Sequence, residues 1–433
     1  MMHLEKEKIA VIGLGYVGLP LAVAFAKHFQ TVGFEIDEEK VLSYINGIDK
    51  TKEIGDENLK KAELKFTTKI EDIRESTVYI VAVPTPITNE NQPDLGALKS
   101  ASKTVAKVLK KGDFVIYEST VYPGATEEIC LPLLEAGSGL TQGEDFKIGY
   151  SPERINPGDK IHHLENITKI VAGCNAESTE KIAKIYETII EAGVYRASSI
   201  KVAEATKVVE NTQRDVNIAF MNEMAIMFDK MNINSRDVVD AMNTKWNALR
   251  FYPGLVGGHC IGVDPYYLSF KAARLGIPSD MILTSRRINE RTTSFVKDAL
   301  IKQLNLAGIK VKGARVAILG LTFKENCPDT RNSKIIDLIN ELKEYEMTFL
   351  INDDWVDTEE VKSEYGLDVI SFSKIKDVDA AIFAVNHEYF QNLLKSDIDA
   401  LFSEKNDELV IIDLRGMFDE SDYQLPFYRY WSL

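Results

Sequence analysis

The sequence predicts an α/β protein with two doubly wound, Rossmann-like domains joined by a central all-helical region that contains one long helix. Two observations predict this fold. Short β-branched runs alternate with amphipathic helical stretches in the first and last parts of the chain, which is typical of βαβ units and a parallel sheet. Between these parts lies a stretch without glycine or proline whose apolar residues recur at helical spacing. We therefore expect three domains, at residues 1–200, 201–308 and 309–433.

The first domain opens with a glycine-rich turn between a strand and a helix. We expect strands at 9–13, 31–35, 78–83, 114–117 and 148–150, and a helix at 20–29. Residues 9–26 carry no charge, and such a run can also indicate a membrane span. Their three glycines and one proline instead favour a strand, a turn and a buried helix, so we expect no membrane association.

The central region is predicted to be helical. A helix at 200–231 and a second helical stretch at about 278–306 flank a loop at 254–264, which we expect to be the catalytic loop. Long helices between two domains often form dimer interfaces, so we expect a homodimer or a higher homo-oligomer. In the last domain, we expect strands at 316–320, 347–352, 380–385 and 409–414 and a helix at 334–345. This domain has no GxGxxG motif, which is the glycine pattern of dinucleotide-binding turns. It therefore need not bind a second dinucleotide in addition to one held by the first domain.

Length and composition exclude several classes of protein. Of the 433 residues, 45% are hydrophobic and 27% are charged, as in ordinary globular proteins and unlike disordered or collagen-like chains. The 51 basic and 66 acidic side chains give a formal charge of −15, which repels phosphate backbones, so we expect no nucleic-acid partner. The four cysteines form no CxxC pair and fit a reducing cytoplasm, and no residue spacing predicts a metal site.

Residues 13–18, Gly-Leu-Gly-Tyr-Val-Gly, predict a dinucleotide-binding turn. Gly13 allows a tight turn, Gly15 lets a pyrophosphate approach the backbone, and Gly18 lets the helix pack closely on the strand. The helix N-terminus then offers free amides to the phosphates. The expected second strand ends in Glu35, and an acid here binds a ribose diol and repels a 2′-phosphate, which favours NAD over NADP. The alternative is a glycine-rich turn without a ligand.

The segment 257–260, Gly-Gly-His-Cys, makes Cys260 a candidate nucleophile. Two glycines let a ligand come close to the thiol, and Asp264 can orient groups around it. The alternative is a small buried hydrophobic residue, which is the commonest role of a cysteine. Among the other cysteines, Cys327 lies in a polar loop and is the rival nucleophile.

Polar residues elsewhere suggest a second group of contacts. Lys207, Asn211 and Arg214 share one face of the expected long helix, and an amide between two cations suits a bound anion or oxyanion. The alternative is a solvated helix face. Thr120 and Glu153 each follow an apolar strand, and ligands bind at the carboxyl ends of strands in open parallel sheets. Either residue can equally belong to a turn or cap.

Seven motifs, in this order, resemble the UDP-glucose/GDP-mannose dehydrogenase family. They are Ile-Gly-Leu-Gly-Tyr-Val-Gly-Leu-Pro at 12–20, Val-Pro-Thr-Pro at 83–86, Ser-Thr-Val-Tyr-Pro-Gly at 119–124, Ser-Pro-Glu-Arg at 151–154, Glu-Ala-Thr-Lys-Val-Val-Glu-Asn-Thr at 204–212, Gly-Gly-His-Cys at 257–260 and Gly-Leu-Thr-Phe-Lys at 320–324. The resemblance covers nearly the whole chain. Residues 251–268 look most like the branch that acts on UDP-N-acetylhexosamines in capsule and O-antigen synthesis, including the Vi-antigen type.

The resemblance implies a reaction that the residue pattern alone does not show. The C6 hydroxyl of a UDP-N-acetylhexosamine is oxidised by NAD⁺ to an aldehyde, a cysteine thiolate adds to give a thiohemiacetal, a second oxidation leaves a thioester, and water releases the uronate. The covalent link holds the aldehyde while the cofactor exchanges. One alternative is a UDP-glucose 6-dehydrogenase. An alternative of another class is a non-catalytic nucleotide-sugar sensor.

The resemblance also implies roles for individual residues. Cys260 matches the nucleophile, and Asp264 matches an acid that assists proton transfer. Lys207 and Asn211 match the pair that stabilises the oxyanion, and Thr120 and Glu153 match residues that position water, with Glu153 as the candidate base. The expected NAD contacts are Gly13, Gly15, Tyr16, Val17, Gly18, Glu35, Asp37, Lys40, Val83, Pro84, Thr85, Ser119, Thr120 and Arg331. The expected UDP-sugar contacts are Glu153, Arg154, Lys207, Asn211, Arg214, Asn222, Arg250, Phe251, Tyr252, Gly254, Gly257, Lys324 and Arg415.

Two departures from the family pattern bear on these roles. Glu35 stands where many members have aspartate, and its longer reach leaves Asp37 as an alternative ribose contact. Arg214 differs from the UDP-glucose branch, and our hypothesis is that it marks the substrate branch. Arg250 matches a position that, in several members, reaches the site of the partner subunit.

Overall fold

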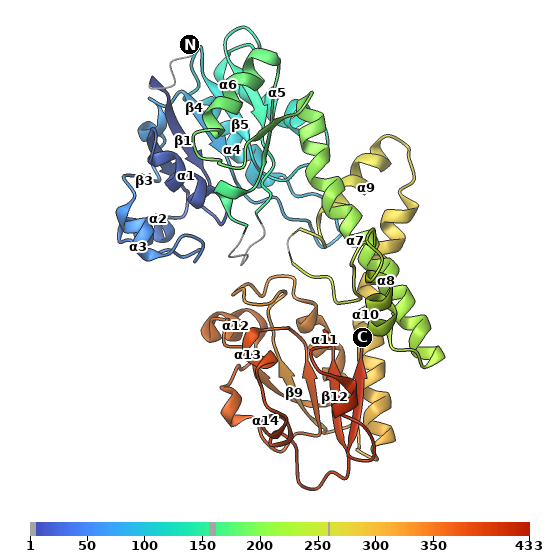
Figure 1. The fold of residues 1–433 in the computed structure, drawn as a ribbon. Coiled ribbons are helices and arrows are strands. Elements are labelled where there is room, and N and C mark those ends of the chain that lie inside the picture. Colours follow the sequence, from blue (N-terminus) through green and yellow to red (C-terminus); the bar gives the residue numbers. More distant parts are fainter. Residues whose placement is uncertain (1–5, 156–161, 259) are drawn as a thin grey trace. The chain divides into compact units, whose positions relative to one another are not determined.

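A computed structural model describes residues 6–155, 162–258 and 260–433 (Figure 1). Contacts between residues divide the chain into two units. Unit 1 comprises Met1–Glu210 and Tyr266–Pro278, and unit 2 comprises Asn211–Pro265 and Ser279–Leu433. Each unit contains one sheet of mainly parallel strands with helices between them, which confirms the predicted α/β class. The division into domains at 1–200, 201–308 and 309–433 stays a prediction.

Unit 1, over its described residues, contains an eight-stranded sheet with the strand order β3-β2-β1-β4-β5-β6-β7-β8. The strands are β1 Lys8–Ile12, β2 Gln30–Phe34, β3 Lys65–Thr67, β4 Val78–Val81, β5 Phe114–Tyr117, β6 Lys147–Tyr150, β7 Lys169–Gly173 and β8 Val194–Arg196. The helices include α1 Gly18–Ala26, α2 Glu38–Ile45, α3 Asp56–Lys61, α4 Gly96–Ala106, α5 Leu131–Ser138 and α6 Ala176–Tyr186. Every residue of β4 and β5 is buried, as expected for strands covered on both faces.

One strand pair corrects the prediction of a parallel sheet. β6 and β7 are antiparallel, whereas the other neighbouring strands of this sheet are parallel. Because β7 is antiparallel to β6, it begins at the edge of the sheet where β6 ends. The connection between these two strands therefore needs no crossover to the opposite edge. As a result, Lys169, the first residue of β7, lies at the same edge as the carboxyl ends of β5 and β6.

Unit 2 contains a five-stranded parallel sheet with the order β10-β9-β11-β12-β13. The strands are β9 Arg315–Leu319, β10 Thr348–Asn352, β11 Ala380–Phe383, β12 Leu409–Asp413 and β13 Tyr428–Ser432. The remaining helices of the chain include α7 Ile200–Met231, α8 Ser235–Asn243, α9 Asp264–Arg274, α10 Asp280–Leu306, α11 Lys334–Lys343, α12 Thr358–Tyr365, α13 Glu388–Gln391 and α14 Lys395–Asp399.

The long helix α7 has the bounds that the sequence predicts, and it passes from unit 1 into unit 2 after Glu210. Its last part packs on the sheet of unit 2, because the indole Nε1 of Trp431 donates to Asp229 at 2.9 Å. The ring of Phe295, on α10, meets the Trp431 ring edge to face at 5.6 Å. The last part of α7, α10 and the C-terminal sheet therefore share one hydrophobic core.

Candidate active site

The turn between β1 and α1 has the geometry that its glycines predict. Gly13 adopts a φ of +90°, and its N–H donates to the backbone of β2 at 2.9 Å. A Cβ on Gly18 would lie 1.8 Å from the carbonyl oxygen of Gly13, so only glycine lets α1 begin this close to the strand. Beyond its chain neighbours, no atom of the described residues would lie within 4 Å of a Cβ on Gly15. The turn, which includes Tyr16 and Val17, therefore leaves its backbone open to a pyrophosphate.

Glu35 is the acid held beside this turn. Its Oε2 accepts from the N–H of Leu14 at 3.1 Å, and its Oε1 accepts from the N–H of Ile36 at 2.8 Å. The Lys40 ammonium lies 3.9 Å from Oε2. Asp37 instead caps α2 by accepting from the N–H of Lys40 at 3.0 Å. This arrangement favours Glu35 over Asp37 as the ribose acid, and Glu35 would repel a 2′-phosphate.

The loops after β4 and β5 lie beside the same turn. The Ser119 hydroxyl donates to the carbonyl oxygen of Val83 at 2.6 Å. The Tyr267 hydroxyl donates to the carbonyl oxygen of Thr85 at 2.8 Å. A Cβ on the first glycine of the turn would lie 2.9 Å from Cγ1 of Val83. Segment 83–85 and Ser119 therefore border the predicted NAD site.

Thr120 and Glu153 follow β5 and β6, which pair in parallel, so both residues come from one edge of the sheet. Glu153 is 7% exposed, and its Oε1 accepts from the N–H groups of Arg154 and Ile155, both at 2.6 Å. The Arg154 guanidinium pairs with Glu210 at 3.3 Å. Two backbone donors thus fix the orientation of the Glu153 carboxylate.

Glu204, near the start of α7, holds the loop that carries Thr120. Its Oε1 accepts from the N–H of Thr126 at 2.9 Å, and its Oε2 accepts from the N–H of Gly124 at 2.5 Å. The side chain is fully buried, and burial raises the pKa of Glu204 to about 7. The Thr120 loop is therefore fixed to α7 one turn before Lys207.

Lys207 and Asn211 lie one turn apart on α7 and are 9% and 6% exposed, so the solvated-face alternative does not describe them. Arg214 is only partly exposed. The Asn211 amide donates to Oδ2 of Asp264 at 2.6 Å. Asp264 begins α9, and its N–H donates to the carbonyl oxygen of Cys260 at 2.9 Å. Asp264 therefore bonds through its side chain to Asn211 and through its backbone to Cys260.

The two candidate nucleophiles differ in exposure. Cys260 is partly exposed, whereas Cys327 is 2% exposed and closed to a substrate. This difference favours Cys260. His259, which belongs to the same motif, lies outside the described residues.

A pocket within unit 2 gathers several predicted contacts to the UDP-sugar. Its lining includes Gly257, Lys324 and Arg415, together with Lys334, which the sequence did not single out. A Cβ on Gly257 would lie 2.5 Å from the carbonyl oxygen of Asn332, so this position needs glycine. The lining has three cations and one acidic residue, Glu325, which lies 3.7 Å from the Arg415 guanidinium, and a net positive lining suits a diphosphate.

Asn222 shapes the loop before this pocket. Its Oδ1 accepts from the N–H of Gly254 at 2.8 Å, and its amide donates to the carbonyl oxygen of Gly254 at 3.0 Å and to Asn289 at 2.8 Å. The side chain is fully buried. The Asn222 side chain therefore holds the backbone at Gly254 with its acceptor and one donor, and its other donor is used by Asn289.

The remaining predicted contacts are spread over unit 2. The Tyr252 hydroxyl donates to Asp240 at 2.5 Å. Phe251 is partly exposed, and Arg250 is exposed with a φ of +56°. Arg331, an expected NAD contact, pairs with Asp329 at 2.7 Å. The roles of these residues stay predictions.

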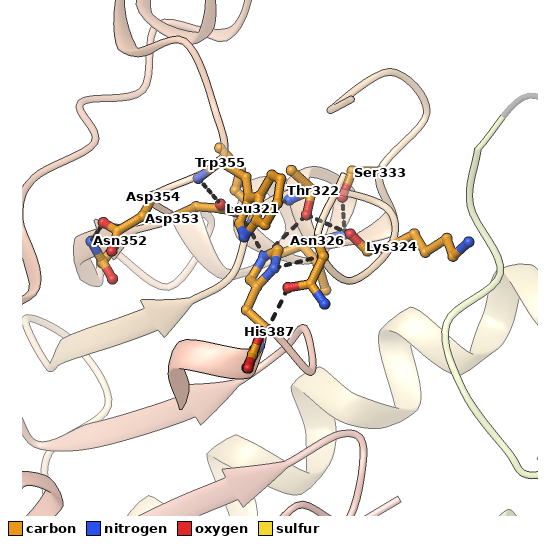
Figure 2. A network of polar contacts seen from close by, with 12 residues as sticks. Leu321, Thr322, Lys324, Asn326, Ser333, Asn352, Asp353, Asp354, Trp355 and His387 are labelled. Carbon is orange, nitrogen blue, oxygen red and sulfur yellow. Dashed lines mark hydrogen bonds and ion pairs between the residues drawn. The ribbon is translucent and has the colours of Figure 1, made fainter. Parts of the chain in front are cut away.

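A buried network holds the loop that carries Lys324 (Figure 2). Oδ2 of Asp353, which follows β10, accepts from the N–H groups of Leu321 at 2.7 Å and Thr322 at 3.0 Å. His387 Nε2 lies 3.1 Å from the same oxygen, and its Nδ1 accepts from the N–H of Asn326 at 3.0 Å. Figure 2 shows the Lys324 side chain extending away from this network. The network therefore fixes the backbone of the loop, while the Lys324 ammonium group points away from the network.

The two units use the same turn differently. Gly320, like the first glycine of unit 1, has a positive φ (+99°), and its N–H donates to Asn352 at 2.9 Å. Asp353 stands where unit 1 has Glu35, but His387 occupies the space beside its carboxylate. This contact supports the expectation that the C-terminal domain does not need to bind a second dinucleotide.

Sequence reasoning missed a set of buried polar residues around these sites. They are Glu118, Lys169, Glu204, Asp215, Arg286, Asn289, Asp353 and His387. The signal that could have indicated these residues is a charged side chain at one end of an apolar strand, such as Lys169 at the start of Lys169–Gly173. Such a charge needs a partner when it is buried.

Two further features bear on function. In the described ranges, no group of three or more histidine, cysteine or acidic residues is arranged to hold a metal ion. Over the same part of the chain, no helix is both long and apolar enough to span a membrane.

Comparison with known proteins identifies the family. Residues 7–190 match the NAD binding domain of the UDP-glucose/GDP-mannose dehydrogenase family, residues 201–291 its central domain, and residues 317–420 its UDP binding domain. The chain belongs to the UDP-glucose/GDP-mannose dehydrogenase family. This finding confirms the predicted resemblance, and the family member described here is an NAD-dependent oxidoreductase.

Individual relatives cover nearly the full length of this dehydrogenase. It is 51% identical to the UDP-N-acetyl-D-glucosamine 6-dehydrogenase of Salmonella typhi over 98% of this chain and 100% of the relative. It is 50% identical to the enzyme of the same name from Pseudomonas aeruginosa, over 96% and 99%. The solved structure of a UDP-D-ManNAc dehydrogenase from Pyrococcus horikoshii matches with a TM-score of 0.87 and 32% identity, over 98% of both chains.

Proposed function

We propose that this dehydrogenase oxidises the C6 hydroxyl of UDP-N-acetylglucosamine to the uronic acid, as a precursor for a surface polysaccharide. The observation that carries the proposal is the 51% and 50% identity to two UDP-N-acetyl-D-glucosamine 6-dehydrogenases along almost the whole chain. Identity to the UDP-D-ManNAc dehydrogenase of known structure is lower, at 32%. This difference favours the gluco configuration.

The proposed chemistry assigns one role to each candidate catalytic residue. The glycine turn would hold NAD⁺, which would supply the hydride acceptor for two oxidations. The Cys260 thiolate adds to the C6 aldehyde, and the electron pair of the carbonyl moves to its oxygen. Lys207 and the Asn211 amide stabilise this oxyanion. The bond between Asn211 and Asp264 keeps the amide in place and supports this assignment.

Hydrolysis of the thioester needs a base and a placed water. Glu153 takes a proton from water whose oxygen adds to the carbonyl carbon, and Thr120 holds that water by hydrogen bonding. When the C–S bond breaks, its electron pair stays on the sulfur of Cys260. The fixed orientation of Glu153, with two backbone donors at 2.6 Å, supports its role as base.

We also propose that two copies associate along α7. Val202, Val209, Phe220, Met227 and Met231 are each between 43% and 55% exposed. Their spacings of seven, eleven, seven and four residues place them on one face of the helix. Apart from the exposed Gln213, the stripe is apolar, and a stripe of this length suits a second copy of the same helix. We also propose a cytoplasmic location, because the four cysteines are free thiols, which suits a reducing compartment.

A comparison of three substrates tests the proposed function. We expect the highest kcat/KM with UDP-N-acetylglucosamine, and lower values with UDP-N-acetylgalactosamine and UDP-glucose. A preference for UDP-glucose would identify a UDP-glucose 6-dehydrogenase instead. Tight binding of all three without formation of NADH would favour the non-catalytic sensor.

A further inference from the structure

A buried cluster at the edge of the unit 1 sheet contains one ammonium and two carboxylates. Lys169 Nζ donates to Oε2 of Glu118 at 2.6 Å and to Oε2 of Glu153 at 3.2 Å. The Tyr186 hydroxyl donates to the other oxygen of Glu118. The three charged side chains are 3%, 0% and 9% exposed, in the order Lys169, Glu118, Glu153.

Three strands bring this cluster together. Glu118 directly follows β5, Glu153 lies three residues after β6, and Lys169 begins β7. Lys169 reaches this edge only because β7 is antiparallel to β6. The same edge carries Thr120, so the cluster lies beside the candidate catalytic residues of this unit.

The charges in the cluster depend on one another. Burial raises the pKa of Glu118 to about 7, against the opposing effect of Lys169. Burial alone would lower the pKa of Lys169, but Glu118 and Glu153 raise it above its ordinary value. Lys169 therefore remains an ammonium, and it is the only cation that contacts either carboxylate among the described interactions.

The contacts of Glu153 restrict how it can meet a water. A carboxylate has about four lone-pair positions for hydrogen bonds. The N–H groups of Arg154 and Ile155 use two of them, and Lys169 uses a third. One direction remains for a water molecule, and Lys169 determines which direction that is.

We propose that Lys169 is a positioning residue for thioester hydrolysis, because it holds Glu153 with one lone pair directed at the attacking water, while Glu118 balances its charge. The inference rests on the proposed function, since it assumes a thioester on Cys260. In this step the water oxygen bonds to the carbonyl carbon and the water proton moves to Glu153. The C–S electron pair then returns to the sulfur of Cys260.

The test compares Lys169→Met, which removes the charge, with Lys169→Arg, which keeps it. Rapid mixing with NAD⁺ and the preferred UDP-sugar measures the first turnover, and intact-protein mass measures any adduct on Cys260. For Lys169→Met we expect a burst of about two NADH per site, followed by steady-state turnover slowed roughly 10²-fold, as for loss of a placed general base. The thioester adduct accumulates, the KM for both substrates stays near the wild-type value, and Lys169→Arg restores part of the rate.

The pH dependence of kcat distinguishes a positioning role of Lys169 from a purely structural role. Lys169 lowers the pKa of Glu118 and the Glu153 carboxylate raises it, so removal of the ammonium leaves the repulsion between the two carboxylates unopposed. Tyr186 is the other titratable group in the cluster, and the nearby Arg154 is already paired with Glu210. The acid limb of the kcat profile should therefore move up by about one pH unit or more in Lys169→Met.

A control variant outside the cluster and a second variant within it distinguish the possible outcomes of this test. Lys181→Met removes a lysine of α6 that pairs with Glu7 outside the cluster, and it should leave the burst and the pH profile unchanged. If Lys169→Met does not fold, Glu118→Gln tests the same cluster, and a burst with a Cys260 adduct is again expected. A folded Lys169→Met with wild-type hydrolysis and an unshifted profile would overturn the inference alone. A wild-type enzyme that forms only one NADH per sugar would overturn the proposed function as well.

Discussion

At the scale of single residues, exposure distinguishes the two candidate nucleophiles. Cys260 is partly exposed, and its carbonyl oxygen accepts from the N–H of Asp264 at 2.9 Å, whereas Cys327 is 2% exposed. A thiol can attack a sugar aldehyde only if the sugar reaches it. The sequence made both cysteines candidates, because a polar loop around Cys327 does not reveal that its side chain is buried.

Replacement of Cys260 tests this distinction. We expect Cys260→Ala to lower the rate of uronate formation by roughly 10³-fold or more, because the covalent step is lost. Cys327→Ala should retain activity within about threefold if the protein remains stable. Steady-state NADH formation with both variants provides the measurement. Full activity in Cys260→Ala together with inactive Cys327→Ala would reverse the assignment.

Protonation of the buried Glu204 carboxyl makes the free energy of unfolding depend on pH. Its pKa rises from 4.5 to about 7 on folding, so the folded protein binds more protons than the unfolded chain between these pH values. The free energy of unfolding should therefore fall as pH rises from about 4.5 to about 7. Glu204→Gln should remove this contribution, which is at most about 3 kcal/mol by linkage.

Denaturant unfolding at pH 5 and pH 7 measures this effect. Wild type should lose more stability over the interval than Glu204→Gln. Glu223→Gln, at an exposed position of the same helix, should behave like wild type. An equal loss in wild type and Glu204→Gln would show that this carboxyl is not the group that titrates.

At the scale of elements, the loop that carries Lys324 depends on His387. Nδ1 of His387 accepts from the N–H of Asn326 at 3.0 Å, which leaves Nε2–H to donate to Asp353. We expect His387→Ala to raise the KM for the UDP-sugar about tenfold, the equivalent of roughly one hydrogen bond. The KM for NAD should stay within about twofold, because the glycine turn belongs to the other unit.

A conservative variant sharpens this prediction. His387→Asn retains an acceptor for the N–H of Asn326, so it should recover part of the affinity. Initial-rate kinetics with each substrate varied in turn provide the values. Equal increases in both KM values for His387→Ala would point to general loss of structure instead of a local effect on the loop.

Regular elements were the part of the fold that the sequence predicted best. The apolar period of α7 predicted the observed bounds, and the glycine spacing predicted the turn before α1. The direction of β7 was missed, because residue pattern does not distinguish parallel from antiparallel pairing. Lys169 was missed with it, since its position at the edge of the sheet depends on that direction.

The buried polar contacts between helices could not be predicted from the sequence either. Arg286 and Asn289, on α10, bond to Asp215 on α7 at 2.6 and 2.7 Å. In the sequence these residues have the spacing and composition of an exposed helix face. Only the packing of α10 against α7 shows that they are buried and paired. The same is true of Asn222, which reaches Gly254 from α7.

At the scale of the whole molecule, the apolar stripe on α7 predicts self-association. Phe220 is 54% exposed at the middle of the stripe. Phe220→Asp would place a charge in the proposed interface between two copies, so we expect it to convert a dimer to a monomer in analytical ultracentrifugation. Glu360→Ala, at an exposed position of α12, should leave the mass unchanged. A wild-type protein that sediments as a monomer would contradict the proposed association.

We propose that this one enzyme carries out both oxidations through a thioester on Cys260. The most direct measurement is the number of NADH molecules formed per molecule of UDP-N-acetylglucosamine consumed. We expect about two NADH and one uronate per sugar, as the covalent route requires. One NADH per sugar, with an aldehyde or ketone as the final product, would contradict it and remove the role assigned to Cys260.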